Sequence, residues 1–206
     1  TLSGLYSPGS TIKPIVALSA LENKVINENF KVRCTGKTEL YGQTFHCWKE
    51  KGHGLVNLKD AMKQSCDTYF YEIARILGVD KLKITAEKFG LGKKVLGKYF
   101  ENEKHGLFPN TIWKKNNLGK GWVLGETLIT GIGQGYTQTT PLQLCLMTAQ
   151  IANGGYKISP KIIVNNKPLN FLEAKKNMEL RSSIDPNLQL IRDKKNLEIV
   201  QKAMFS

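Results

Sequence analysis

Two residues near the start of the chain have the chemistry of an activated nucleophile. Ser10 precedes Lys13 by three positions, and on a helix this spacing places a hydroxyl and an amine on one face, within reach of a proton transfer. A serine hydroxyl attacks a carbonyl when a base takes its proton, so the pair predicts Ser10 as nucleophile and Lys13 as general base. The same spacing also fits a capped helix with a surface lysine, and the short motif alone does not choose between the two.

Two other segments pair a serine with an aspartate two residues later. Ser65 and Asp67 lie in a stretch of helical apolar periodicity, so a rigid element would hold them. Ser183 and Asp185 have the same form, but they precede Pro186 in a polar region that lacks such periodicity. We therefore predict Ser65 and Asp67 as catalytic residues and set the later pair aside. The competing interpretation of Ser65 and Asp67 is a small core residue beside an exposed acid.

Three cysteines and a histidine offer the ligand types that zinc favours. Cys34, Cys47, His53 and Cys66 bracket a long irregular stretch and the second serine segment, although their spacing is not a standard zinc-finger pattern. We predict a structural zinc on these four residues, with His46 as the alternative histidine. A disulfide between Cys34 and Cys47, with Cys66 as a small buried residue, is the other hypothesis.

A fourth cysteine is not expected to join this group. Cys145 lies within a strongly apolar helical segment, so it is predicted to be a buried thiol instead of a ligand. His105 has no predicted partner.

The elements that must position these side chains are mostly helical. A turn at Tyr6–Gly9 leads into a helix that Ser10 would cap, with Pro14 in the first turn, where a missing N–H costs little. Further helices are predicted for residues 57–78, 81–89, 140–153 and 197–205. The other stretches are predicted as a long loop at 33–56, a glycine-rich loop at 90–124, a strand or turn at 128–136, an extended segment at 156–164 and a weakly ordered polar segment at 167–193.

The composition is that of one globular domain. With 206 residues, of which 41% are hydrophobic and 23% charged, the chain can bury one sizeable core. Its net charge of +13 comes mostly from scattered lysines, whereas a nucleic-acid surface would cluster arginines and aromatics on one face, so nucleic-acid binding is not expected. No apolar stretch approaches the roughly 18 residues of a membrane span. If the parent protein is exported, we expect its anchor upstream of Thr1.

Three segments stand out together in the chain. They are Tyr6-Ser-Pro-Gly-Ser-Thr-Ile-Lys-Pro14, Ser65-Cys-Asp-Thr-Tyr-Phe-Tyr71, and Gly131-Ile-Gly-Gln-Gly-Tyr136 followed by Thr140-Pro-Leu-Gln143. A Ser-x-x-Lys motif with a second serine triplet is typical of penicillin-binding proteins and serine β-lactamases. The three segments resemble signatures of class B penicillin-binding proteins, in particular the penicillin-binding protein 2 group, and their order and spacing match that group across nearly the whole chain. The triplet reads Ser-x-Asp here, as in the penicillin-binding protein 2 group.

The resemblance implies an α/β (α+β) fold of the penicillin-binding-protein and serine β-lactamase type, in which helices flank a central antiparallel sheet. This chain would hold mainly the helical part, and residues 1–206 would form part of one transpeptidase domain. The third family motif, a Lys-Ser/Thr-Gly strand that follows a helix resembling 197–205, has no match in the sequence. We therefore expect a fragment that lacks an upstream anchor, a pedestal domain and the downstream strand, and that is inactive by itself.

The resemblance also implies an activity. The protein would be a serine-type D-Ala-D-Ala transpeptidase that cross-links peptidoglycan stem peptides during cell elongation and rod-shape maintenance, and β-lactams would inhibit it. Ser10 would attack the penultimate D-Ala carbonyl and Lys13 would accept its proton. Ser65 would relay a proton toward the leaving D-Ala, while Asp67 would orient Lys13 or the substrate. The alternatives are a serine β-lactamase, a β-lactam sensor domain, or an inactive scaffold of a cell-wall complex.

Further expectations concern the metal, the partners and the location. Some members of the penicillin-binding protein 2 group carry a structural zinc in this region, and the resemblance places it on the three cysteines and His53, although the family has carboxylates where Cys34 and Cys47 stand. The chemistry itself would need no cofactor. The expected partners are a rod-shape scaffold protein and a SEDS-type glycosyltransferase. The expected location is the periplasmic face of the bacterial inner membrane.

Overall fold

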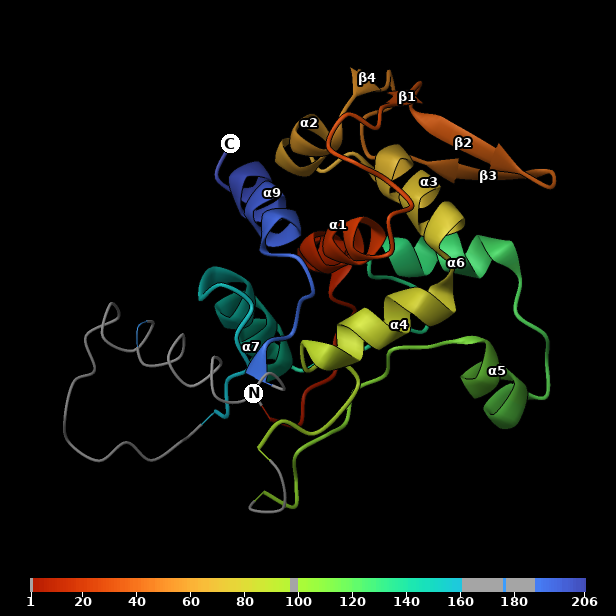
Figure 1. Cartoon of the computed structure of the whole chain (residues 1–206). Coiled ribbons are helices and arrows are strands. Elements are labelled where there is room, and N and C mark those ends of the chain that lie inside the picture. The colour runs from red at the N-terminus through yellow and green to blue at the C-terminus, as the bar shows by residue number, and fades with distance from the viewer. Residues whose placement is uncertain (1, 97–99, 161–175, 177–187) are drawn as a thin grey trace.

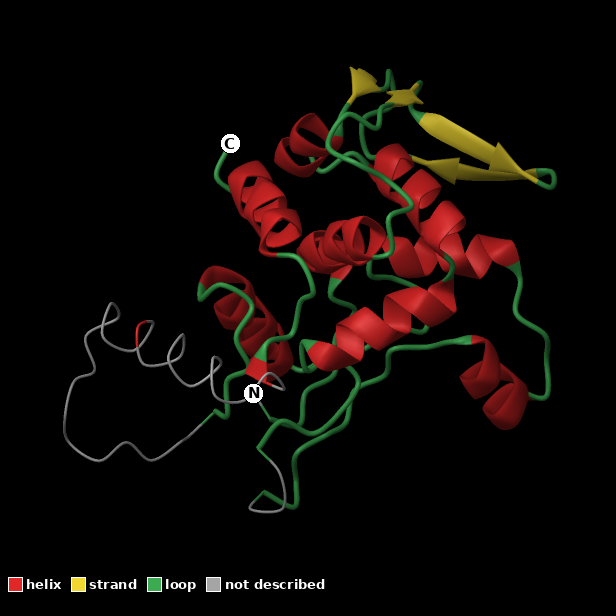
Figure 2. Ribbon diagram, viewed as in Figure 1, coloured by secondary structure: helices red, strands yellow, loops and turns green. Residues whose placement is uncertain are grey.

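A computed structural model describes residues 2–96, 100–160, 176 and 188–206, and the fold is rich in helices (Figure 2). The chain enters through a 3-10 turn, η1 (Gly9–Ile12), which continues into helix α1 (Lys13–Glu22). The predicted helix is confirmed, but Ser10 is not its cap. Pro8 occupies the N-cap position without a side-chain bond, and Ser10 lies within the 3-10 turn with an exposed side chain.

Helix α1 forms the centre of the molecule. Every residue from Lys13 to Leu21 is buried, as expected for a helix whose surface is apolar almost all round. It packs against α3 (Asp67–Leu77), α4 (Val79–Lys88) and α9 (Lys194–Met204), and Figure 1 shows these helices arranged around it. Because α1 is enclosed, the residues at its start are held in a fixed position.

The predicted helix over 57–78 is two helices. Asn57 caps α2 (Leu58–Lys63) as expected, since its side chain accepts from the Asp60 amide, but the chain breaks at residues 64–66 before α3 begins. Ser65 has a φ of 51°, in the left-handed region that ends helices. The Ser65 carbonyl accepts from Lys13 Nζ instead of from a helical amide. The apolar periodicity of the sequence could not reveal this contact between distant residues.

The stretch predicted as a long loop contains two antiparallel strand pairs, of which the inner one is a hairpin. Strands β1 (Val32–Cys34) and β4 (Gly54–Val56) pair with Cys34 opposite Gly54, and β2 (Lys37–Leu40) pairs with β3 (Gln43–His46). These strands have only three or four residues, too few for a clear alternation of apolar and polar side chains. Both strand pairs contact α3, and Figure 1 shows them next to that helix.

The remaining helices include confirmed and missed elements. Helix α4 fits the prediction for 81–89, α7 (Pro141–Ala152) has the expected start with a Thr140–Gln143 capping box, and α9 begins three residues earlier than predicted. The glycine-rich region contains a missed helix, α5 (Thr111–Leu118). A strand or turn was predicted at 128–136. Helix α6 (Leu124–Gly131) includes the first four of these residues, whereas turns follow at 132–133 and 135–136, as predicted.

The wrong prediction for α6 has a packing reason. A Cβ on Gly131 would lie 2.4 Å from Ala74 Cβ in α3, so the glycine permits close approach of two helices, not of two strands.

Of the segment predicted as extended from Tyr156, the part to residue 160 is described, and Tyr156 forms an antiparallel β-bridge with Gln189. Most of the segment 167–193, with Ser183 and Asp185, lies outside the described residues. No helix within the described ranges is long and apolar enough to cross a membrane.

Candidate active site

Four predicted residues form one hydrogen-bonded chain. Ser65 Oγ lies 3.0 Å from Ser10 Oγ and 2.9 Å from Lys13 Nζ. Lys13 Nζ also donates to Asp67 Oδ1 at 2.8 Å. The turn between α2 and α3 thus faces the first turn of α1. The link from Ser10 to Lys13 runs through the hydroxyl of Ser65, whereas the sequence predicted a direct contact between the first two.

The ammonium group of Lys13 is enclosed. Its side chain is 2% exposed, and Nζ lies 5.2 Å from the centre of the Phe70 ring. The three N–H donors of the group match three acceptors, namely the carbonyl of Ser65, the hydroxyl of Ser65 and the carboxylate of Asp67. A buried charge needs such partners because it has lost its water. The lysine is therefore held in one orientation, with one donor directed at Ser65 Oγ.

A tryptophan that the sequence interpretation missed completes this arrangement. The backbone N–H of Trp48 donates to Asp67 Oδ2 at 3.0 Å, so both carboxylate oxygens are engaged. Its indole N–H donates to the carbonyls of Gln64 and Ser65 at 3.0 and 3.1 Å. The signal available in the sequence was its position directly after Cys47, inside the stretch predicted as a loop.

Backbone geometry at two points fixes the serines. Ser65 adopts a left-handed conformation that is strained for a residue with a Cβ, and its hydrogen bonds to Lys13 and Trp48 hold it there. Behind Ser10, the Gly9 amide donates to the Gly133 carbonyl at 2.9 Å. A Cβ on Gly133 would lie 2.2 Å from Gly9 O. The glycine motif after α6 therefore supports the turn that carries the nucleophile.

These residues open into a pocket of about 610 Å³. Side chains from the 3-10 turn, β3, α3 and the segment after α6 meet there. The lining residues are Ser10, His46, Cys47, Trp48, Ser65, Asp67, Tyr71, Ile132 and Gln134.

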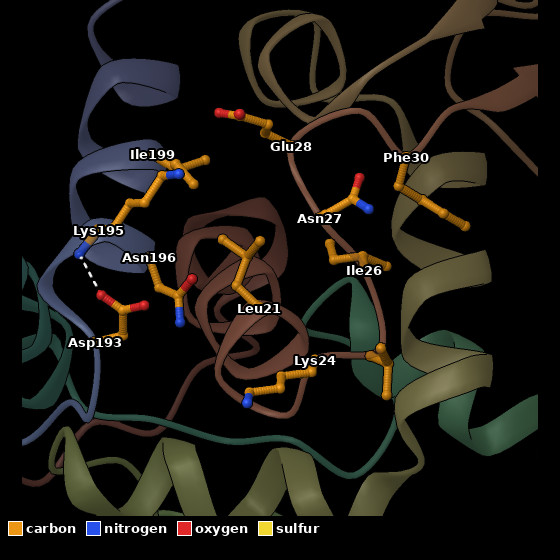
Figure 3. A pocket seen from close by; sticks show the side chains of 11 residues that line it. Leu21, Lys24, Ile26, Asn27, Glu28, Phe30, Asp193, Lys195, Asn196 and Ile199 are labelled. Carbon is orange, nitrogen blue, oxygen red and sulfur yellow. Dashed lines mark hydrogen bonds between the residues drawn. The ribbon is translucent and has the colours of Figure 1, made fainter.

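A second hollow, of about 510 Å³, lies between the end of α1 and the start of α9 (Figure 3). It is lined by apolar side chains such as Leu21 and Ile199 together with lysines and carboxylates. Asp193 there caps α9 by accepting from the Lys195 amide at 2.9 Å. Among its described residues no serine or cysteine stands beside a base, so the Ser10 pocket is the candidate for catalysis.

The predicted metal-ligating residues also come together. The ligand atoms of Cys34, Cys47, His53 and Cys66 all lie within 4.8 Å of one another. The sulfur atoms of Cys34 and Cys47 are each 3.5 Å from His53 Nδ1. All three cysteines are buried and free, so the structure does not contain the alternative Cys34–Cys47 disulfide. His46 lines the active-site pocket instead of this cluster.

The donor set fits a tetrahedral zinc ion. With Zn–S near 2.3 Å and Zn–N near 2.0–2.1 Å, a sulfur and a nitrogen of one tetrahedron are about 3.6 Å apart, close to the two distances from His53 Nδ1. Burial raises the pKa of the Cys34 thiol, but hydrogen bonds from Thr68, His53 and Gly36 outweigh it and lower the pKa to about 6. Burial raises the pKa of Cys66 above its usual value. Cys34 is thus better prepared than Cys66 to bind a cation at neutral pH.

The prediction for the fourth cysteine is wrong. Cys145 is exposed, because the buried face of α7 is formed by Gln143, Leu146, Met147 and Gln150. The apolar sequence around it did not reveal which face of the helix meets the core.

Two similar proteins are named peptidoglycan D,D-transpeptidases. The chain is 39% identical over 164 residues to the peptidoglycan D,D-transpeptidase MrdA of Acinetobacter baumannii, an alignment that covers 79% of this chain and 24% of that protein. It is 36% identical over 164 residues to the protein of the same name from Escherichia coli K12, covering 79% of this chain and 26% of the relative. The chain therefore spans about a quarter of the length of these relatives.

Solved structures share the fold. Pseudomonas aeruginosa PBP2 in complex with WCK 5153 superposes with a TM-score of 0.82 at 37% identity, over 98% of this chain and 44% of that one. Helicobacter pylori PBP2 in complex with MreC superposes with a TM-score of 0.81 at 34% identity, over 98% and 35%. These similarities confirm the expected α/β fold. Residues 1–204 match the family described as the penicillin binding protein transpeptidase domain, and the chain belongs to that family.

Proposed function

We propose that the full-length protein containing this chain is a peptidoglycan D,D-transpeptidase of cell elongation and rod-shape maintenance. The observation that carries the proposal is the chain of contacts from Ser10 through Ser65 to Lys13 and Asp67. Because the chain spans about a quarter of its relatives, the activity is assigned to the whole protein. The names of the relatives described above support a transpeptidase, not a β-lactamase, a sensor or an inactive scaffold.

In the acylation step, Ser10 Oγ forms a bond to the penultimate D-Ala carbonyl carbon of a stem peptide. Its proton moves to Ser65 Oγ as the hydroxyl proton of Ser65 moves to Lys13 Nζ, which must be neutral at that moment. This route runs along the 3.0 and 2.9 Å contacts, in the reverse of the direction in which the charged lysine donates to Ser65 and Ser65 donates to Ser10. The bond from that carbon to the terminal D-Ala nitrogen then breaks, and the proton returns through Ser65 to the leaving amine.

In the second step, an amine of another stem peptide attacks the ester carbon. A new amide bond forms, the bond to Ser10 Oγ breaks, and the serine recovers a proton that the amine gives up. Asp67 would hold Lys13 near Ser65 during both steps, since its carboxylate remains bound to the Trp48 amide and to Nζ. A β-lactam would follow the first step, because its strained amide acylates the same hydroxyl.

Cys34, Cys47, His53 and Cys66 would hold a structural zinc ion. With all four positions taken by protein, the ion would stabilise the fold and not activate water. The cluster joins the two strand pairs to the start of α3, since Cys66 lies between Ser65 and Asp67. The Thr68 hydroxyl is 3.3 Å from Cys34 Sγ. The proposed metal would therefore fix the turn that presents Ser65.

The proposed setting is the periplasmic face of the inner membrane. The proposed partners are a rod-shape scaffold protein and a SEDS-type glycosyltransferase. Support comes from the PBP2–MreC complex of Helicobacter pylori and from a structural neighbour in a peptidoglycan synthase complex that coordinates polymerization and crosslinking, at 26% identity and a TM-score of 0.72.

The test is covalent labelling of the full-length protein with penicillin, followed by intact mass spectrometry. We expect a lasting adduct with the mass of penicillin, and none in Ser10→Ala. The matched control is Ser7→Ala, which removes a serine hydroxyl outside the hydrogen-bonded chain in the same motif and should leave labelling unchanged. An adduct that survives in Ser10→Ala would refute the assignment of the nucleophile, and rapid loss of the wild-type adduct by hydrolysis would indicate a β-lactamase.

A further inference from the structure

Trp48 connects the cysteine–histidine cluster to the catalytic turn. It follows Cys47 directly in the sequence, and its ring meets the His53 ring edge-on, with centres 5.4 Å apart. The indole N–H reaches the carbonyls of Gln64 and Ser65. One side chain thus contacts both a cluster histidine and the backbone that carries Ser65.

Two of the three acceptors of Lys13 are shared with Trp48. The Ser65 carbonyl accepts from Lys13 Nζ at 2.9 Å and from the indole N–H at 3.1 Å. The Asp67 carboxylate accepts from Lys13 through Oδ1 at 2.8 Å and from the Trp48 amide through Oδ2 at 3.0 Å. A displacement of Trp48 would therefore change the position of both groups that orient the lysine.

The turn that carries Ser65 needs support of this kind. Ser65 is left-handed at φ 51°, a conformation that persists only when surrounding contacts impose it. The cluster holds the turn from one side through Cys66, and Trp48 holds its carbonyls from the other. The geometry of the two serines consequently depends on the segment from Cys47 to His53, which is far from Ser10 in the sequence.

We propose that Trp48 is a positioning residue. It holds the Ser65 carbonyl and the Asp67 carboxylate against Lys13, and it transmits the state of the cysteine–histidine cluster to the reacting serine. The inference rests on the proposed function for the reaction that is affected. It adds a residue and a route of control that the Ser-x-x-Lys and Ser-x-Asp motifs do not contain.

A competing role must be separated from this one. Trp48 is 64% exposed and lines the pocket, so its ring could contact a ligand directly. A ligand-contacting ring would affect non-covalent binding, whereas a positioning indole N–H would affect the rate of acylation after binding. The substitution Trp48→Phe keeps an aromatic ring and the backbone N–H, and it removes the indole donor.

The experiment measures acylation of the full-length protein by a fluorescent penicillin, resolved into the dissociation constant of the first complex and the acylation rate constant. For Trp48→Phe we expect a rate constant lowered about fivefold, the effect of one ordinary hydrogen bond, with the dissociation constant unchanged and only a small decrease in the melting temperature. The matched control is Trp122→Phe. It removes an indole N–H that donates to Thr127 Oγ1 at 2.8 Å, outside the pocket, and should leave the rate unchanged.

A second arm tests the route from the cluster. Cys47→Ser should slow acylation in the wild type and slow it by a smaller factor in the Trp48→Phe background, because the two changes act through one contact. The emission of Trp48, obtained as the difference between wild-type and Trp48→Phe spectra, should shift in the Cys47→Ser protein. This spectroscopic result does not depend on activity.

The outcomes separate the two proposals. If the wild type forms no adduct at Ser10, the proposed function fails, and the emission shift alone decides whether Trp48 senses the cluster. If the wild type is acylated and Trp48→Phe reacts at the same rate, the positioning role is overturned while the function stands. A changed dissociation constant with an unchanged rate constant would also overturn it, since it assigns Trp48 to ligand contact.

Discussion

The substitution Asp67→Asn should lower the free energy of unfolding by about 3 kcal/mol, within the range for breaking one side of a buried ion pair. Asparagine keeps the shape of the side chain and a carbonyl oxygen that can accept from Lys13 Nζ. What is removed is the negative charge that faces an almost fully buried ammonium group, together with the oxygen that accepts from the Trp48 amide. The destabilisation would therefore measure mainly the cost of leaving the Lys13 charge without its counter-charge, with a smaller contribution from the lost bond to Trp48.

The magnitude follows from the geometry. At 2.8 Å, the attraction between unit charges is about 6 kcal/mol for an effective dielectric constant of about 20. The cost should be smaller than this because the hydrogen bond is retained and the Asp67 side chain is 13% exposed, so water can approach. About 3 kcal/mol corresponds to a decrease of about 6–12 °C in the melting temperature for a domain of this size.

The assay is calorimetric unfolding of the protein with a matched substitution on the same helix. Glu72→Gln also replaces an acid by its amide in α3, but the ion pair of Glu72 with Arg75 is largely exposed and is expected to contribute less than about 1 kcal/mol. In the double variant Lys13→Met/Asp67→Asn the loss should be smaller than the sum of the single losses, because no unpaired charge remains. If Asp67→Asn destabilises the protein no more than Glu72→Gln does, the reasoning is refuted.

Three further predictions concern the cluster and its surroundings. Gly52→Ala should abolish metal binding in elemental analysis, because the new Cβ would lie 2.2 Å from Cys34 O. The control is Gly54→Ala, where φ is similarly positive but a Cβ would meet no atom within 4 Å, so that it should cost only about 1–2 kcal/mol of stability. Equal effects of the two substitutions on metal binding would contradict a steric cause. The pKa of Cys34 is lowered to about 6 from 9.0 in the folded protein, so the stabilisation by its thiolate is complete above about pH 9 and is lost as the pH falls through 6. Zinc affinity in a chelator competition should accordingly decrease more steeply with falling pH below about pH 6 than above it, because Cys34 must then also lose a proton on binding. The same slope above and below pH 6 would exclude Cys34 as a ligand. Iodoacetamide should label the exposed Cys145 in the native protein, and it should label the buried Cys34, Cys47 and Cys66 only after unfolding, as measured by peptide mass. Rapid labelling of Cys66 in the native protein would contradict the burial of the cluster.

The sequence could predict features that depend on neighbouring residues. The side chain of Asn57 and the Thr140-Pro141 pair mark helix starts, since capping and the missing proline N–H act within one turn. The three-residue spacing of Ser10 and Lys13 places them on one turn whatever surrounds it. The residue types at Cys34, Cys47, His53 and Cys66 indicated a common site, because few other roles bring such ligands into one region.

Contacts between distant segments were decided only by the tertiary structure. The break at Ser65 was invisible because the apolar period continues through it, and it exists because Lys13 and Trp48 take the carbonyls that a helix would otherwise use. The same fold inserted the Ser65 hydroxyl between Ser10 and Lys13 and brought Trp48 to Asp67. The type and spacing of residues determined which groups could react, but hydrogen bonds across about fifty positions of sequence determined which of them meet, since those bonds form only after the helices have packed.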